Sequence, residues 1–153
     1  VTWAARGGRV SCCGMDGTVR AWDPENGEEL HQETLWYEGL AQCVAWNAVG
    51  TRVASGHEDA RVRVWDWASG KALYTLEASS SSIRAVAWSP DGTRLASGGG
   101  WGVSMWNSES AEELLAMDGE NFETSIRGIA WSPDATRLVI CDGGTIEIWS
   151  ISE

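Results

Sequence analysis

The chain is a succession of short apolar runs separated by turn residues, and the pattern is clearest over residues 83–107. There, two apolar runs flank the turn Ser89-Pro90-Asp91-Gly92, and a third run ends at Trp106. Proline presets φ, aspartate bonds its own backbone and glycine tolerates a positive φ, so these residues favour a tight turn. The pattern predicts three short antiparallel strands.

The same unit recurs along the whole chain, as two registers of tryptophan show. The first register has spacings of 43, 42 and 43 residues and consists of Trp3, Trp46, Trp88 and Trp131. The second has spacings of 43, 41 and 43 residues and consists of Trp22, Trp65, Trp106 and Trp149. Eight of the eleven tryptophans therefore belong to one repeat, and we expect these eight to be structural.

Alternation with period 2 supports a β-structure for each copy. The run that ends at the second tryptophan places one apolar pair on a common face, as in Val62/Val64, Val103/Met105 and Ile146/Ile148. The run that ends at the first tryptophan has small residues at alternating positions, such as Ala45 and Ala87, which suit strands crowded around an axis.

These features resemble the WD-repeat (WD40) β-propeller family over all 153 residues. The closing Trp-Asp pair of the family stands at Trp22-Asp23 and Trp65-Asp66, and its hairpin motif at Ser89-Pro90-Asp91-Gly92. The resemblance implies an all-β fold, a β-propeller of four-stranded antiparallel blades, with strands a to d from the axis outward. The Gly-His pair that usually precedes strand a is missing. We therefore expect an incomplete His–Asp–Ser–Trp network, although Asp16 and Asp59 hold its aspartate position.

The repeat divides the chain into four blades, which lie at about residues 1–40, 41–82, 83–125 and 126–153. The last copy lacks its outer strand. Since propellers have about four to eight blades, we expect half of an eight-bladed ring or a fragment of a larger propeller. A homodimer would complete the ring, the remainder of a longer chain would do the same, and a tight four-bladed ring is the third possibility.

The net charge of the chain excludes some classes of binding partner. The net charge is −11, which opposes phosphate backbones and anionic membranes, so neither nucleic acid nor a membrane is expected to bind. The acidic residues concentrate in the outer strands, where a solvated rim explains them. No apolar run exceeds four residues, so neither a membrane span nor the apolar core of a signal peptide is expected, although a removed signal stays open.

The sequence offers little for chemistry. Four cysteines without CxxC spacing, Cys12, Cys13, Cys43 and Cys141, indicate free thiols in a reducing, cytoplasmic compartment. His31 and His57 have no partners at ligand spacing, so no metal and no cofactor are expected. Neither a nucleophile elbow nor an HExxH motif is present, and we predict no enzyme and no catalytic residues.

Two classes of function remain. The first is a non-enzymatic protein-interaction scaffold, alone or as part of a larger signalling or effector protein, because the d–a and b–c loops of the resembled family usually dock proteins or peptides. The side chains expected in those loops are Trp101, Trp36, Tyr37, His57, Glu58, Arg84, Arg127 and Met15. Trp101 is the leading candidate because glycines flank it, although it would equally pack under a loop. The alternative is a small-ligand-binding or enzymatic propeller that uses the central channel.

Overall fold

The computed structural model describes residues 1–4, 8–14, 16, 18–34, 39–78, 82–100, 102–117 and 125–151. This part of the chain folds into four antiparallel sheets, each made of strands consecutive in sequence. Sheet 1 consists of β1 (Thr2–Trp3), β2 (Val10–Cys13), β3 (Thr18–Trp22) and β4 (Glu29–Thr34). Sheet 2 consists of β5 (Ala41–Trp46), β6 (Arg52–His57), β7 (Arg61–Asp66) and β8 (Ala72–Glu77). Sheet 3 consists of β9 (Ile83–Trp88), β10 (Arg94–Gly99), β11 (Gly102–Asn107) and β12 (Glu113–Met117). Sheet 4 consists of β13 (Gly128–Trp131), β14 (Arg137–Cys141) and β15 (Ile146–Ser150).

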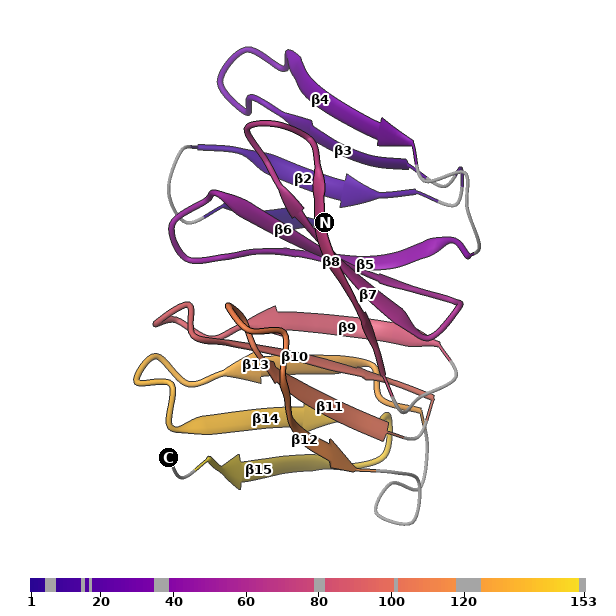
Figure 1. Ribbon diagram of the computed structural model, residues 1–153, viewed down its shortest axis with the longest axis vertical. Coiled ribbons are helices and arrows are strands. Elements are labelled where there is room, and N and C mark those ends of the chain that lie inside the picture. The colour runs from indigo at the N-terminus through magenta and orange to yellow at the C-terminus, as the bar shows by residue number, and fades with distance from the viewer. Residues whose placement is uncertain are drawn as a thin grey trace.

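The four sheets follow one another along the longest axis of the molecule, so that sheets 1 and 4 lie at opposite ends (Figure 1). Consecutive sheets contact each other mainly at the inner strand of the later sheet: β1 and β2 lie against β5, β5 lies against β9, and β9 lies against β13. The described sheets thus form an open series rather than a tight four-bladed ring, and that possibility is wrong. Within the described residues no helix is long and apolar enough to cross a membrane.

The strand registers explain the two series of tryptophans. In sheet 3, Trp88 and Trp106 both pair with Leu95 on the middle strand between them. The equivalent residues of the other sheets, Val10, Val53 and Leu138, stand between two tryptophans in the same way. The repeat therefore encodes one cross-strand arrangement four times, with aromatic side chains on both sides of one aliphatic residue.

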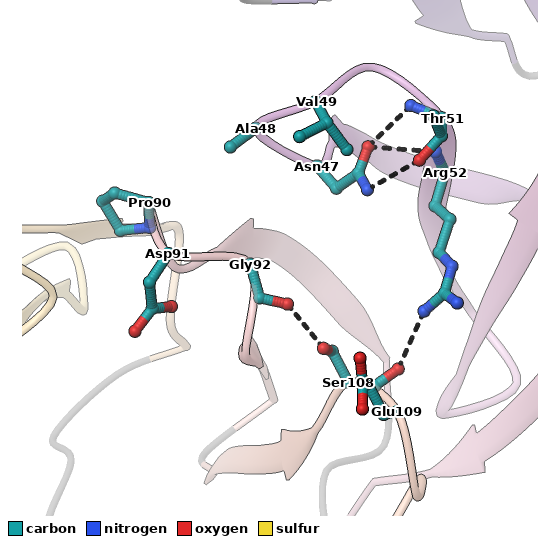
Figure 2. Close-up of a pocket in the computed structure, with 10 residues that line it drawn as sticks. All are labelled: Asn47, Ala48, Val49, Thr51, Arg52, Pro90, Asp91, Gly92, Ser108 and Glu109. Atoms are coloured by element: carbon teal, nitrogen blue, oxygen red, sulfur yellow. Dashed lines mark hydrogen bonds between the residues drawn. The ribbon is translucent and has the colours of Figure 1, made fainter.

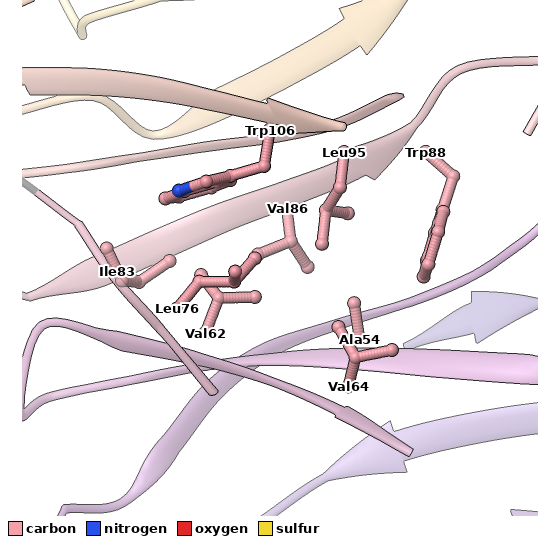
Figure 3. Packing of buried hydrophobic residues seen from close by; sticks show 9 residues of the cluster. All are labelled: Ala54, Val62, Val64, Leu76, Ile83, Val86, Trp88, Leu95 and Trp106. Carbon is pink, nitrogen blue, oxygen red and sulfur yellow. The ribbon is translucent and has the colours of Figure 1, made fainter. Parts of the chain in front are cut away.

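Packing between sheets uses the faces that the alternation predicts. Between sheets 2 and 3, Val62 and Val64 of β7 are fully buried in one cluster with Val86 and Trp88 of β9 and with Leu95, as Figure 3 shows. Two similar clusters join sheet 1 to sheet 2 and sheet 3 to sheet 4. The alternation of β7 thus places its valines on the next sheet, which confirms the expected face.

Hydrogen bonds of the first tryptophan series also join consecutive sheets. The indole N–H groups of Trp88 and Trp131 donate to the Ala45 and Ala87 carbonyl oxygens of the preceding inner strands, at 3.2 and 3.1 Å. The indole of Trp46 donates instead to the Ser11 hydroxyl, at 3.0 Å. Buried indole N–H groups usually find such a partner, so the tryptophans fix the register between sheets.

The two ends of the series expose the faces that are buried elsewhere. Trp3 is 62% exposed, whereas its equivalents Trp46 and Trp88 are 7% and 8% exposed. Ile148 on the far face of sheet 4 is 63% exposed, whereas Val64 at the equivalent place in sheet 2 is fully buried. Among the eight tryptophans expected to be structural, Trp3 is thus exposed because none of the other described sheets covers its face of sheet 1.

Candidate protein-interaction surface

The stack has two edges with different chemistry. The loop edge is where each sheet leads into the next and where the second strand joins the third, at residues 39–40, 58–60, 125–127 and 142–145. The turn edge carries the tight turns at residues 47–51, 66–71, 89–93, 107–112 and 132–136. Of the residues expected to bind a partner, Trp101, Trp36, Tyr37 and Met15 lie outside the described part of the chain.

Arg84 and Arg127 lie at the start of two neighbouring inner strands, four residues before Trp88 and Trp131. Both side chains are exposed. Among the described residues neither arginine forms an ion pair or a hydrogen bond through its side chain. The repeat thus places two uncompensated guanidinium groups at equivalent positions of the loop edge, on a protein of net charge −11.

The other arginines near this edge are compensated by carboxylates. Arg63 lies 2.6 Å from Asp59, and Arg20 lies 2.9 Å from Asp16 in the equivalent pair of sheet 1. Burial raises the pKa of Asp59, but the hydrogen bond and charge of Arg63 outweigh it and hold that pKa below its usual value. Because these carboxylates already neutralise their arginines, Arg84 and Arg127 are, within the described part of the edge, the cations that remain available to an anion.

Glu58 is the third expected contact residue that reaches the surface of the loop edge. Its carboxylate accepts a hydrogen bond of 2.7 Å from the Gln42 amide, and both side chains are exposed. Gln42 occupies in sheet 2 the position that Arg84 occupies in sheet 3. The edge therefore changes from an acid–amide pair on sheet 2 to free cations on sheets 3 and 4.

His57 is not a surface residue, and its expected role in partner binding is wrong. It is the last residue of β6 rather than part of a loop, and its side chain is fully buried. Its Nδ1 lies 3.1 Å from the Gly39 carbonyl, which only accepts, so Nδ1 carries the proton. Its Nε2 then accepts from the Ser55 hydroxyl at 2.8 Å, and Ser55 accepts from the Trp65 indole at 3.1 Å.

This chain of hydrogen bonds replaces much of the network that was expected to be incomplete. The histidine comes from the second strand of the sheet instead of the loop before the first, and Asp59 binds Arg63 instead of the histidine. Burial lowers the pKa of His57, which keeps the imidazole neutral and structural. The network was expected to be incomplete because the Gly-His pair is missing, and the missing pair gives no indication that β6 supplies another histidine.

The turn edge holds a pocket that the sequence does not reveal. It has a volume of about 290 Å³ between the turn at residues 47–52 of sheet 2 and two turns of sheet 3 (Figure 2). Its walls are Asn47, Ala48, Val49, Thr51, Arg52, Pro90, Asp91, Gly92, Ser108 and Glu109. The residues come from turns far apart in sequence, so only the packing of sheet 2 on sheet 3 brings them together.

The described residues show no arrangement typical of an active site. They contain no group of three or more His, Cys, Asp and Glu side chains that could hold a metal ion. Burial raises the pKa of the Cys43 thiol to about 12, and a thiol of that pKa is a poor nucleophile. The Ser55–His57 pair is buried without access for a substrate.

The sequence repeats match the family model "WD domain, G-beta repeat" over residues 1–23, 38–66, 70–107 and 113–150. The chain belongs to the WD40 family. WD40 propellers typically bind proteins or peptides and are generally non-enzymatic scaffolds. A search among curated proteins found no significant match to this WD40 chain.

Proposed function

We propose that this WD40 chain is a non-enzymatic scaffold that binds an acidic segment of a partner protein at its loop edge. The supporting observation is the pair of exposed, uncompensated guanidinium groups of Arg84 and Arg127. Arginine is enriched at binding hot spots and pairs with carboxylate or phosphate through two parallel hydrogen bonds. Trp101, Trp36, Tyr37, Met15 and Glu58 are the further contact residues of this proposal.

The test compares proteins captured by the wild-type chain with those captured by the double variant Arg84→Ala/Arg127→Ala. The matched control is Arg137→Ala, which removes an exposed arginine from the opposite, turn edge. We expect a partner that the wild type and the control retain and that the double variant loses by about tenfold or more. Equal retention by all three proteins would contradict the proposed surface.

We propose in addition that the chain assembles end to end with a second copy, which would make a ring of eight sheets. The exposed apolar side chains at the two ends, Trp3 on sheet 1 and Ile146 and Ile148 on sheet 4, support this assembly. They belong to the two kinds of face that already pack together three times within the chain. Two such head-to-tail contacts close a ring if each blade turns by about 45°. The remainder of a longer chain would cover the same faces.

Light scattering after size exclusion tests the assembly. A two-copy ring has twice the 16.6 kDa of one chain. Ile148→Glu is expected to give a folded monomer, because it buries an unpaired charge in the contact. Leu73→Glu, on an exposed position of the outer strand β8, is expected to leave the assembly intact. A wild-type monomer at micromolar concentration would contradict the two-copy ring.

A further inference from the structure

One position of the repeat carries a different side chain in each of three sheets. It is the second residue after the Trp of the third strand, and it is occupied by Trp67, Ser108 and Ile151. In each case its backbone N–H donates to a threonine carbonyl of the neighbouring turn, at 2.9, 2.9 and 2.8 Å. The backbone therefore holds this position in the same place while the side chain varies.

At the junction of sheets 1 and 2, the side chain at this position is an indole. The ring of Trp67 meets the ring of Trp46 edge to face, with 4.8 Å between centroids and an interplanar angle of 62°. The guanidinium carbon of Arg9 lies over Trp67, 5.6 Å from its centroid. An aromatic ring thus occupies the space between the turns, stacked under a cation from the preceding sheet.

At the junction of sheets 2 and 3, the corresponding residue is Ser108, and the pocket of about 290 Å³ lies beside it (Figure 2). Arg52 occupies the position of Arg9 and forms one wall, where its guanidinium donates to the Ser108 carbonyl at 3.2 Å. The apolar part of the wall consists of Pro90 and of Val49, which is 55% exposed. The pocket therefore has an arginine at the position from which Arg9 covers the indole one sheet earlier, together with an apolar rim of its own.

We propose that this pocket receives an aromatic side chain, of the size of tryptophan, from a basic peptide segment of a partner. The ring would stack on Arg52 as Trp67 stacks under Arg9. A volume close to 300 Å³ is at the small end of ligand pockets and suits one ring-bearing side chain better than a larger ligand. The packing of Trp67 under Arg9 thus indicates how an aromatic side chain of a partner would sit against Arg52.

The charge around the pocket sets the residues that flank the aromatic ring. Asp91 and Glu109 line the pocket and also a second hollow of about 210 Å³ beside it. Burial raises the pKa of Asp91, but hydrogen bonds from Ser89 and Thr93 outweigh it, so the pKa lies below its usual value and the group is a carboxylate at neutral pH. Two carboxylates on a protein of net charge −11 favour lysine or arginine next to the ring.

This surface is independent of the acidic partner proposed above, because the pocket lies on the turn edge and Arg84 and Arg127 lie on the loop edge. Either surface can therefore fail its test while the other one holds.

The test uses a capped Lys-Trp-Lys peptide as the probe, titrated into the ¹⁵N-labelled full chain by NMR. We expect saturable shifts of the amide signals of Thr51, Gly92 and Ser108. A capped Lys-Ala-Lys peptide should bind about tenfold more weakly or not at all, since it lacks the ring. A capped Glu-Trp-Glu peptide should also bind more weakly, because its charges oppose Asp91 and Glu109.

Two variants locate the binding. Ser108→Trp places an indole in the pocket on a backbone that already holds Trp67 in sheet 2, and it is expected to abolish the shifts. Ser110→Trp adds an indole to an exposed position of the same turn outside the pocket and is expected to leave binding unchanged. If Ser108→Trp does not fold, Arg52→Gln provides the same test, with binding expected to weaken about threefold. Equal binding of the Trp and Ala peptides, or unchanged binding by Ser108→Trp or by Arg52→Gln, would overturn the proposal.

Discussion

Replacing Ser55 with alanine removes the centre of the hydrogen-bond chain that links Trp65 to His57. The hydroxyl accepts from the Trp65 indole at 3.1 Å and lies 2.8 Å from His57 Nε2. Both Ser55 and His57 are fully buried. The alanine variant therefore leaves a donor and an acceptor without their partner, and water has no access to the imidazole.

The repeat provides a matched control in the next sheet. Ser97 holds the position of Ser55 and is 1% exposed, but Gly99 stands where sheet 2 has His57. The Ser97 hydroxyl has no hydrogen-bond partner among the described residues. Ser97→Ala deletes a buried polar atom that contributes no hydrogen bond there. The two serine-to-alanine changes therefore remove the same side-chain atom, but only Ser55→Ala breaks hydrogen bonds.

The expected losses of stability depend on which hydrogen-bond partners each serine has. An orphaned buried polar group costs about 1–3 kcal/mol, and the half-buried Trp65 regains part of its loss by contact with water. We therefore expect Ser55→Ala to lower the free energy of unfolding by about 2–3 kcal/mol. For Ser97→Ala we expect no loss, or a gain of up to about 1 kcal/mol, because an unpaired hydroxyl is no longer kept from water.

Urea unfolding of the wild type and both variants, followed by tryptophan fluorescence, measures these differences directly. A drop of about 2–3 kcal/mol corresponds to a melting temperature lower by about 5–10 °C for a chain of this size. Equal losses in the two variants would refute the reasoning, because they would show that the hydrogen-bond chain of His57 contributes nothing beyond the packing of a serine.

Three further predictions concern stability. Burial lowers the pKa of His57 in the folded state, so unfolded chains bind more protons than folded ones below pH about 6.5. The free energy of unfolding should therefore fall as the pH drops below that value. His57→Gln should flatten this dependence, which urea titrations at pH 5 to 8 would measure. Gly99→Ala should lower the free energy of unfolding by about 3 kcal/mol, because the new Cβ would come within 1.7 Å of the Ser82 carbonyl oxygen. Gly128→Ala should lower it far less, because its Cβ meets only the Cβ of Cys141, at 3.8 Å. Thermal unfolding of both variants measures the difference. Trp106→Ala, at a side chain that is 2% exposed, should cost about 3–5 kcal/mol by the same measurement, and a loss below about 1 kcal/mol would contradict its place in the core.

The fold could be predicted almost entirely from the sequence, because the repeat imposes the same geometry four times. Each copy pairs its two tryptophans with one aliphatic residue. A wrong strand assignment in one copy would therefore disagree with the assignment in the other three. The alternation of Val62 and Val64 also gave the correct buried face. The exposure of Trp3 depends on which other sheet packs against sheet 1, and the pattern within one copy carries no information about that.

The candidate sites were less predictable, since they depend on differences between copies. His57 looks like a loop residue beside Glu58 and Asp59, and only the extension of β6 to His57 shows that the side chain turns inward. The pocket beside Ser108 is invisible in one copy alone. Comparison of Ser108 with Trp67 would have located it, because the loss of a large side chain at a fixed backbone position leaves a space.

Binding through the loop-edge arginines is tested most directly by the affinity of a captured partner for the wild type and for Arg84→Glu/Arg127→Glu at two salt concentrations. We predict that the charge reversal weakens binding by more than about tenfold. Added salt should weaken the wild-type complex and not the variant complex, because the two ionic contacts are absent from the variant. Equal affinities with the same salt dependence would contradict the claim that this WD40 chain binds its partner through Arg84 and Arg127.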